Sequence, residues 1–153
     1  MRKLIACVDS KFGIAKNDQI PWAFKDDLKF FREKTINQTV VMGTKTMLSL
    51  PNGFLDNREN CVISSNLSSA KNCKVFKSIN DFLNTYDDFW VIGGAKIYNA
   101  FLALDQIDYA LITFVKHDYA ADIFLDQKYL AKFEKKMVFD SVKYSILEYS
   151  KIN

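Results

Sequence analysis

Short apolar runs alternate with longer, more polar stretches along most of the chain. The apolar runs are rich in β-branched and aromatic residues and predict strands at 3–9, 39–43, 60–64, 74–77, 89–92 and 107–116. The stretches between them predict helices at 25–35, 44–50, 79–86 and 95–104. This alternation is typical of an α/β domain whose central sheet is mostly parallel and flanked by helices.

The pattern changes after residue 135. Met137-Val138-Phe139 and the alternating run from Tyr144 to Tyr149 are separated by four residues, which predicts an antiparallel hairpin at the edge of the sheet. No repeat, low-complexity tract or long linker interrupts the sequence, so we expect residues 1–153 to form a single domain. Ser78, three residues before Asp81, resembles a capping box at the start of the third helix.

Composition and charge narrow the classes of partner. The chain of 153 residues is long enough to bury a core without disulfides or metal ions. Its 21 basic and 18 acidic residues give a net charge of +3 with the signs interspersed, which favours a small-molecule partner over nucleic acid. Five apolar residues after the basic start are too few for a signal peptide, and no run approaches the roughly 20 residues of a membrane span. We therefore expect a cytoplasmic monomer without membrane contact.

Cysteine, histidine and glycine are scarce. Cys7, Cys61 and Cys73 form no CxxC pair and are expected to be reduced, structural thiols. The single histidine, His117, follows a predicted strand and is expected at the surface, so a His-rich metal site is excluded and no metal is predicted. The five glycines spell neither GxGxxG nor a P-loop.

Asp27 interrupts the apolar face of the first predicted helix. This face is an i, i+3, i+4, i+7 stripe that we expect to face the core, formed by Phe24, Asp27, Leu28 and Phe31. A carboxylate on an apolar wall is desolvated, so its pKa should rise and it should favour a ligand that donates hydrogen bonds. Alternatively, Asp27 lies near the helix start only because a negative charge there favours the helix dipole.

Three further features could bind anions. Gly93-Gly94 follows an apolar strand and precedes a helix, an arrangement that suits phosphate or a tight structural turn. Lys45 and Lys96 each begin a helix after a strand, where they can meet phosphate oxygens or simply be solvated. Arg58 has the planar fork that binds a carboxylate or phosphate, unless it pairs with Asp56 or Glu59 in its own loop.

Together these residues resemble dihydrofolate reductase over nearly the whole chain. The matching motifs are Gly13-Ile14, Ile20-Pro21-Trp22, Asp27-Leu28-Lys29-Phe30-Phe31, Val41-Met42-Gly43 with Lys45-Thr46, Asn57-Arg58, Val91-Ile92-Gly93-Gly94 with Ile97-Tyr98, and Thr113. The resemblance implies reduction of 7,8-dihydrofolate to tetrahydrofolate by hydride from NADPH, in support of one-carbon and thymidylate metabolism. It also implies that antifolate inhibitors bind.

For the substrate, the resemblance implies that Asp27 grips the pterin, with Thr113 and a water completing the hydrogen bonds, and that Arg58 holds the glutamate carboxylate. The other implied substrate contacts are Ile5, Leu28, Phe31, Leu50, Ile92 and Tyr98. Asp27, Ile20 and Trp22 are the implied catalytic residues, and a water near Ile20 is the expected final proton donor.

For the cofactor, the resemblance assigns three groups of residues and a lid from Gly13 to Ile20. It also implies a cis peptide between Gly93 and Gly94. The nicotinamide contacts would be Cys7, Ile14, Ile20 and Tyr98; the pyrophosphate contacts Lys45, Thr46, Gly93, Gly94, Ala95, Lys96 and Ile97; and the adenosine contacts Ser64, Ser65 and Lys77. Gly13, Gly43 and Thr44 are further implied cofactor contacts.

Some positions depart from the family pattern, and two other classes remain open. Thr44 stands where a basic residue is common, and Asn66 stands where an Arg is frequent, both near the adenosine phosphate. A pyrimidine reductase of riboflavin synthesis shares the fold, but Arg58 and the helix around Asp27 favour a folate. A protein that only binds its ligand would be expected to have lost its acidic site.

Overall fold

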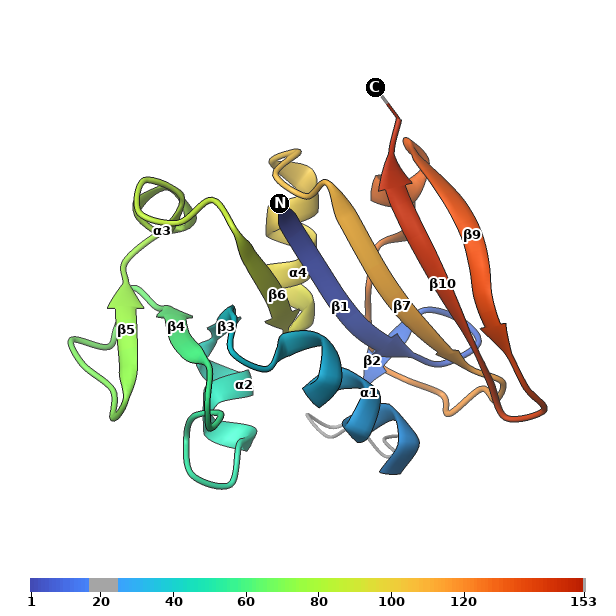
Figure 1. Ribbon diagram of the computed structural model, residues 1–153, viewed down its shortest axis with the longest axis horizontal. Helices are drawn as coiled ribbons and strands as arrows, with labels where there is room; N and C mark the ends of the chain where they lie inside the picture. Colours follow the sequence, from blue (N-terminus) through green and yellow to red (C-terminus); the bar gives the residue numbers. More distant parts are fainter. Residues whose placement is uncertain (17–24, 153) are drawn as a thin grey trace.

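Strands of one large sheet form the centre of the molecule. The computed structural model describes residues 1–16 and 25–152, and in this part eight strands pair in the order β5-β4-β3-β6-β1-β7-β10-β9 (Figure 1). The first six strands in this order are parallel, whereas β10 is antiparallel to both β7 and β9. Their bounds are β1 (Arg2–Val8), β3 (Thr39–Gly43), β4 (Glu59–Ile63), β5 (Cys73–Phe76), β6 (Phe89–Gly93), β7 (Tyr109–Val115), β9 (Phe133–Asp140) and β10 (Tyr144–Lys151). The predicted α/β class and the terminal hairpin are confirmed.

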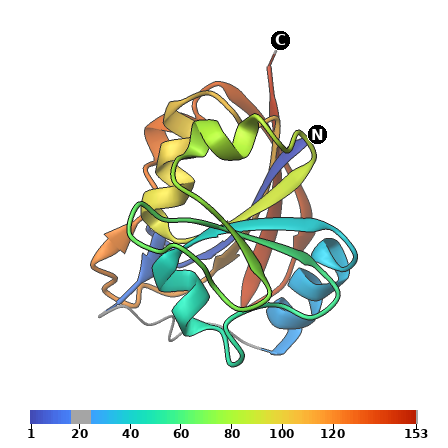
Figure 2. The same ribbon diagram turned by 90° about the vertical axis from the view of Figure 1, so that its left-hand side faces the viewer.

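Helices cover both faces of this sheet. They are α1 (Lys25–Thr35), α2 (Thr44–Ser49), α3 (Ile79–Leu83) and α4 (Ala95–Ala103), close to the predicted bounds. Phe82 of α3 and Phe101 of α4 belong to one buried cluster, whereas Phe30 and Phe31 of α1 pack against a second cluster. Figure 2 shows α1 on one side of the sheet and α3 and α4 on the other. The Ser78 side chain accepts a hydrogen bond from the Asp81 amide, which confirms the cap of α3.

The predicted core face of α1 is confirmed at Phe31 and wrong at Leu28. Leu28, which we expected to face the core, is 60% exposed, while Phe30 and Phe31 pack against the sheet and Thr35 is buried. The packed face is shifted towards Phe30, whose side chain offers more apolar surface than that of Leu28. Asp27 stays next to the packed face, and Phe24 lies outside the described residues.

Two very short strands and a 3₁₀ helix were not predicted from the sequence. Gly13–Ala15 (β2) pairs with Ile123–Phe124 (β8), and Gln127–Leu130 (η1) follows. The buried carboxylate of Asp9 accepts hydrogen bonds from the amides of Lys11, Gly13 and Tyr119. These bonds join the loop after β1 to the loop after β7.

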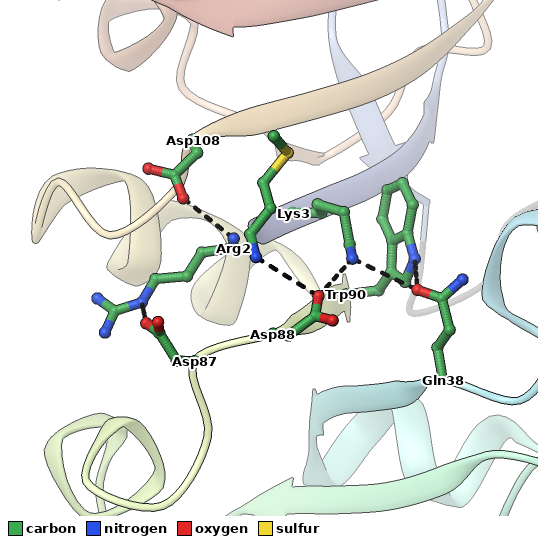
Figure 3. A network of polar contacts seen from close by, with 8 residues as sticks. Arg2, Lys3, Gln38, Asp87, Asp88, Trp90 and Asp108 are labelled. Carbon is green, nitrogen blue, oxygen red and sulfur yellow. Dashed lines mark hydrogen bonds and ion pairs between the residues drawn. The ribbon is translucent and has the colours of Figure 1, made fainter.

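A network of polar and charged side chains lies at the amino ends of β1 and β6 (Figure 3). The Arg2 side chain pairs with Asp87 at 2.8 Å, and Lys3 pairs with Asp88 at 2.7 Å. The Trp90 indole donates to the Gln38 side chain at 3.0 Å. Because Asp87 and Asp88 are well exposed, each ion pair contributes at most about 1 kcal/mol to stability.

Nowhere in residues 1–16 and 25–152 is a helix long and apolar enough to cross a bilayer.

Candidate active site

The predicted site residues gather at the carboxyl ends of the parallel strands, opposite this charged network. Strands β1, β3, β4, β6 and β7 all end at this edge, and α2 and α4 begin there. In open α/β sheets, ligands bind at this edge near the point where the strand order reverses. Here the chain runs outward from β3 to β5 and then returns to insert β6 between β3 and β1.

Asp27 of α1 lies against the sheet where β1 and β7 run side by side. Burial raises the pKa of Asp27, while the side chains of Thr113 and Cys7 partly offset this effect. Thr113 is buried and is the direct register partner of Cys7. The expected rise in the pKa of Asp27 is thus supported by a physical cause, desolvation against an apolar and aromatic surface.

Tyr98 of α4 joins the two strands that flank this position. Its buried hydroxyl lies 2.7 Å from the carbonyl oxygen of Ile5 in β1 and 2.8 Å from that of Ile92 in β6. Both carbonyls belong to residues that the family resemblance assigns to the substrate. The hydroxyl fixes the spacing of β1 and β6 at the point where polar backbone groups approach the site.

Arg58 is held at the other end of α1. Its Nε donates to the backbone carbonyl of Asp56 at 2.9 Å, and Nη1 donates to the hydroxyl of Thr35 at 3.0 Å. Glu59 instead pairs with Lys74 at 2.7 Å, so the Glu59 alternative for Arg58 is not supported. Partial burial and the nearby charge of Arg32 both lower the pKa of Arg58. Two neighbouring guanidinium groups favour an anionic ligand.

Glycines bring the start of α4 close to α2. A Cβ atom on Gly43 would lie 2.9 Å from Cγ1 of Ile97, and one on Gly93 would lie 3.2 Å from the Thr46 hydroxyl. Gly94 precedes the nine-residue helix α4, and no described side chain caps its first amides. The Gly93-Gly94 peptide is cis, as the resemblance implied. Free helix amides behind a glycine pair, with a hydroxyl beside them, fit a diphosphate group.

Residues expected at the adenosine end already hold one surface loop. The Ser64 hydroxyl accepts hydrogen bonds from the amides of Asn66 and Leu67, and the Lys77 ammonium donates to the Leu67 carbonyl at 2.7 Å. Ser65 is exposed next to them. These contacts shape the loop after β4 and leave the adenosine assignment a prediction.

Comparison with known proteins decides the family. The dihydrofolate reductase profile matches residues 1–147. The chain belongs to the dihydrofolate reductase family. It is 32% identical over 134 residues to the dihydrofolate reductase of Ureaplasma parvum, with 84% of each chain covered. With the family come its reaction and cofactor, the reduction of dihydrofolate to tetrahydrofolate with NADPH.

Other relatives support the same placement. The solved structure of the Enterococcus faecalis dihydrofolate reductase, complexed with NADP(H) and RAB-propyl, matches with a TM-score of 0.85 and 25% identity, over 100% of this chain and 97% of that one. A bifunctional dihydrofolate reductase-thymidylate synthase from Paramecium tetraurelia is 32% identical over 126 residues. This chain covers only 27% of that protein's length, so its synthase activity is not transferred.

The remaining dihydrofolate reductase positions are distributed as follows. Ile14 is buried in β2, and Leu50 follows α2 and packs with the cluster that holds Phe31. Exposed positions at the starts of α2 and α4 include Lys45 and Lys96, while Thr44, Gly94, Ala95 and Ile97 are half-buried. The catalytic assignments of Ile20 and Trp22, and the lid beyond Lys16, lie outside the described residues. His117 is exposed, as predicted, and all three cysteines are free.

Proposed function

We propose that Asp27 is the carboxylate that binds the pterin of dihydrofolate. The observation that carries this proposal is a half-buried carboxylate with a raised pKa on the helix that packs over β1 and β7, beside the paired residues Cys7 and Thr113. An ionised carboxylate accepts hydrogen bonds only, and the amino group and ring nitrogen of a pterin supply matching donors. Burial makes this pairing selective, because a ligand without those donors leaves the carboxylate unsatisfied.

The apolar walls around Asp27 suit the flat ring and benzoyl group of the substrate. Ile5 in β1 and Ile92 in β6 are buried, Phe31 of α1 packs against the cluster that contains them, and Leu28, next to Asp27 on α1, is exposed. Leu50 packs with the same cluster as Phe31. We assign these side chains to contacts with the pterin and the benzoyl group. The buried side chains of Ile5 and Ile92 would help to exclude water from the reacting ring atoms.

Arg58 would bind the carboxylate of the glutamate tail. Its guanidinium is oriented by Thr35 and by the Asp56 carbonyl, so the fork is preorganised before a ligand arrives. A bidentate Arg–carboxylate pair is among the strongest charge-assisted contacts in proteins. This placement distinguishes a folate from a pterin that lacks a glutamate.

NADPH supplies the hydride when bound, and the chain's task is to hold it next to the pterin. We assign the diphosphate to Thr46 and to the turn from Gly93 to Ile97, with Gly43, Thr44, Lys45 and Lys96 at its margins. Cys7, Gly13, Ile14 and Tyr98 would lie at the nicotinamide end, and Ser64, Ser65 and Lys77 at the adenosine end. Ile20 and Trp22 keep their assigned roles at the lid and the proton path.

We further propose that residues 1–153 form a single-domain monomer in the cytoplasm. One continuous sheet with both faces covered supports a single domain. Analytical ultracentrifugation tests the oligomeric state. A sedimentation coefficient typical of a 17.7 kDa globular protein is expected, and a dimer would contradict the monomer.

Ligand binding tests the substrate assignment directly. Titration of the protein with dihydrofolate and, separately, with NADPH should show that Asp27→Asn weakens folate binding and leaves NADPH affinity within about twofold. Asp26→Asn is the matched control, because Asp26 is an exposed neighbour on the same helix. Equal folate affinity of wild type and Asp27→Asn would overturn the assignment.

A further inference from the structure

A small cavity lies near the end of the sheet that β9 and β10 form (Figure 1). It has a volume of about 290 Å³, and among the residues that line it are Phe12, Leu130, Phe133, Lys135 and Tyr149. Three of these residues belong to the buried cluster of α3 and α4, whereas α1 packs against the other cluster. The cavity therefore lies on the face of the sheet away from α1 and Asp27.

Tyr149 of β10 carries a buried hydroxyl that lacks a hydrogen-bond partner. The residue is only 5% exposed, and no group in the described part of the chain forms a hydrogen bond with its phenol oxygen. The hydroxyls of Tyr98 and Tyr109, by contrast, each have a partner. Buried polar groups are nearly always paired, so the unpaired hydroxyl beside a cavity points to a partner within the cavity.

Lys135 of β9 brings a positive charge to the same wall of the cavity. It lies directly opposite Tyr149 in the antiparallel pairing of β9 and β10, so both side chains project from one face. The nearby Lys132 and Lys151 both pair with Asp105, at 2.8 and 2.9 Å. Among the residues that the structure describes, no acidic side chain pairs with Lys135 or lines the cavity. An ammonium group beside a phenol donor favours an anionic ligand.

Aromatic and aliphatic side chains form the other walls. Phe12 packs edge-on against Phe114 with ring centroids 5.0 Å apart, and its carbonyl oxygen accepts a hydrogen bond from the Leu125 amide at 2.9 Å. Leu130 of η1 and Phe133 of β9 are buried. Such walls suit a flat ring, which pairs with other rings in offset or edge-to-face contacts. The cavity volume lies at the lower limit of about 300 Å³ for small-molecule sites, so it suits one ring and is too small for a folate or a dinucleotide.

We propose that this cavity is a binding site for a small aromatic carboxylate, separate from the folate and NADPH sites. The carboxylate of the ligand accepts hydrogen bonds from the Tyr149 hydroxyl and the Lys135 ammonium group. Its ring lies against Phe12 and Phe133. The proposal goes beyond the reductase activity and uses none of the residues assigned to the substrate or the cofactor.

Fluorine-19 NMR of 4-fluorobenzoate tests the proposal on the full chain. The protein is saturated with NADP⁺ and folate, so that the probe does not bind at Arg58. Saturable binding with a Kd of about 1 mM or below is expected, and unlabelled benzoate should displace the probe. The uncharged 4-fluorobenzamide should bind about fivefold more weakly, because it lacks the negative charge that Lys135 meets.

Three substitutions locate the bound probe. Tyr149→Phe removes only the hydroxyl, and Lys135→Met removes the charge but keeps an unbranched side chain. Each should raise the Kd for 4-fluorobenzoate about fivefold. Lys136→Met is the matched control, because the next residue along β9 projects from the opposite face of the sheet, and its Kd should equal that of wild type.

Urea denaturation without the probe checks that the Tyr149 hydroxyl is free. Loss of an unpaired hydroxyl removes no hydrogen bond, so Tyr149→Phe should unfold at the wild-type urea concentration or above. Unfolding at a lower urea concentration would show that the hydroxyl already has a partner within the protein, which overturns the proposal.

Binding that Tyr149→Phe and Lys135→Met weaken and Lys136→Met leaves unchanged supports the site. Three results overturn it: no binding up to about 10 mM probe, equal Kd values for wild type and Tyr149→Phe, or equal losses in Lys135→Met and Lys136→Met. The titration is repeated without NADP⁺ and folate. Because the variants mark the cavity and not the folate site, the result can be read even if the substrate assignment fails.

Discussion

The side chain of Thr113 in β7 lowers the pKa of Asp27 in α1, whereas burial of Asp27 raises it. The Thr113 hydroxyl therefore favours the ionised carboxylate, which burial disfavours. Thr113→Val keeps the side-chain shape and removes the donor, so the midpoint of the pH profile of kcat/KM should move to higher pH. A hydrogen bond to a charged group corresponds to about a tenfold change in the ionisation constant. An unchanged midpoint would show that Thr113 does not act on Asp27.

Asp27 also makes the folded state less stable at neutral pH. Its folded pKa lies above the usual value of 3.8, so between these two pKa values the folded chain binds more protons than the unfolded chain. The free energy of unfolding therefore falls as pH rises through this window and stays lower above it. The substitution Asp27→Asn replaces the carboxyl group with an amide that is uncharged at every pH. The free energy of unfolding of this variant at pH 7 should therefore exceed that of wild type by about 0.5–2 kcal/mol.

Urea denaturation of wild type and Asp27→Asn measures this difference. At about pH 3, where the wild-type carboxyl is protonated in both states, the gain should largely disappear. A gain that persists unchanged at acidic pH would indicate that packing, and not ionisation, separates the two proteins.

Arg58 is expected to act on substrate affinity more than on the chemical step. Arg58→Lys keeps the charge but loses the planar fork that Thr35 and the Asp56 carbonyl hold in place. KM for dihydrofolate should rise about tenfold or more with little change in kcat. A dihydropterin without the glutamate tail should be reduced equally well by both proteins. Arg2→Lys at the amino edge of the sheet is the control, and a similar KM change there would contradict the assignment.

A substitution at Gly43 tests whether the close approach of β3 to α4 is needed for NADPH binding. Gly43→Ala would place Cβ 2.9 Å from Cγ1 of Ile97, a branched side chain with little freedom to move. The start of α4 should shift, and the Kd for NADPH should rise about tenfold, a cost of roughly 1.4 kcal/mol. In the control Gly53→Ala, the added Cβ lies within 4 Å of no other atom, so the Kd for NADPH should be unchanged. The folded protein should be less stable, because residue 53 has a positive φ of 79° that favours glycine. Equal Kd values for Gly43→Ala and wild type would contradict this prediction.

Most of the fold could be predicted from the sequence because periodicity reports burial. Strands such as Thr39–Gly43 and Phe89–Gly93 are continuous apolar runs, which is typical of parallel strands buried on both faces. The strands Gly13–Ala15 and Ile123–Phe124 were not predicted, because two or three residues are too few to show the alternation of apolar and polar positions that marks a strand. Leu28 was predicted to pack in place of Phe30, because the exact face that α1 presents depends on the sheet against which it packs.

The candidate site could likewise be predicted only in part. Asp27 was proposed as a site residue because a carboxylate on an otherwise apolar stripe is unusual, and this signal is local. The pairing of Cys7 with Thr113 was not predicted, because it depends on the register of β1 and β7, which are far apart in the chain. Sequence patterns within one element do not report which side chains meet across strands.

The most direct test of the central claim is the turnover of Asp27→Asn. The near-ultraviolet absorbance of NADPH is followed after mixing with dihydrofolate at neutral pH, with Asp26→Asn as the control. Wild type and Asp26→Asn should oxidise NADPH rapidly, whereas Asp27→Asn should be slower by about two or more orders of magnitude. Its NADPH affinity should remain near that of wild type. Turnover of Asp27→Asn at the wild-type rate would contradict the assignment of Asp27 as the carboxylate on which the reaction depends.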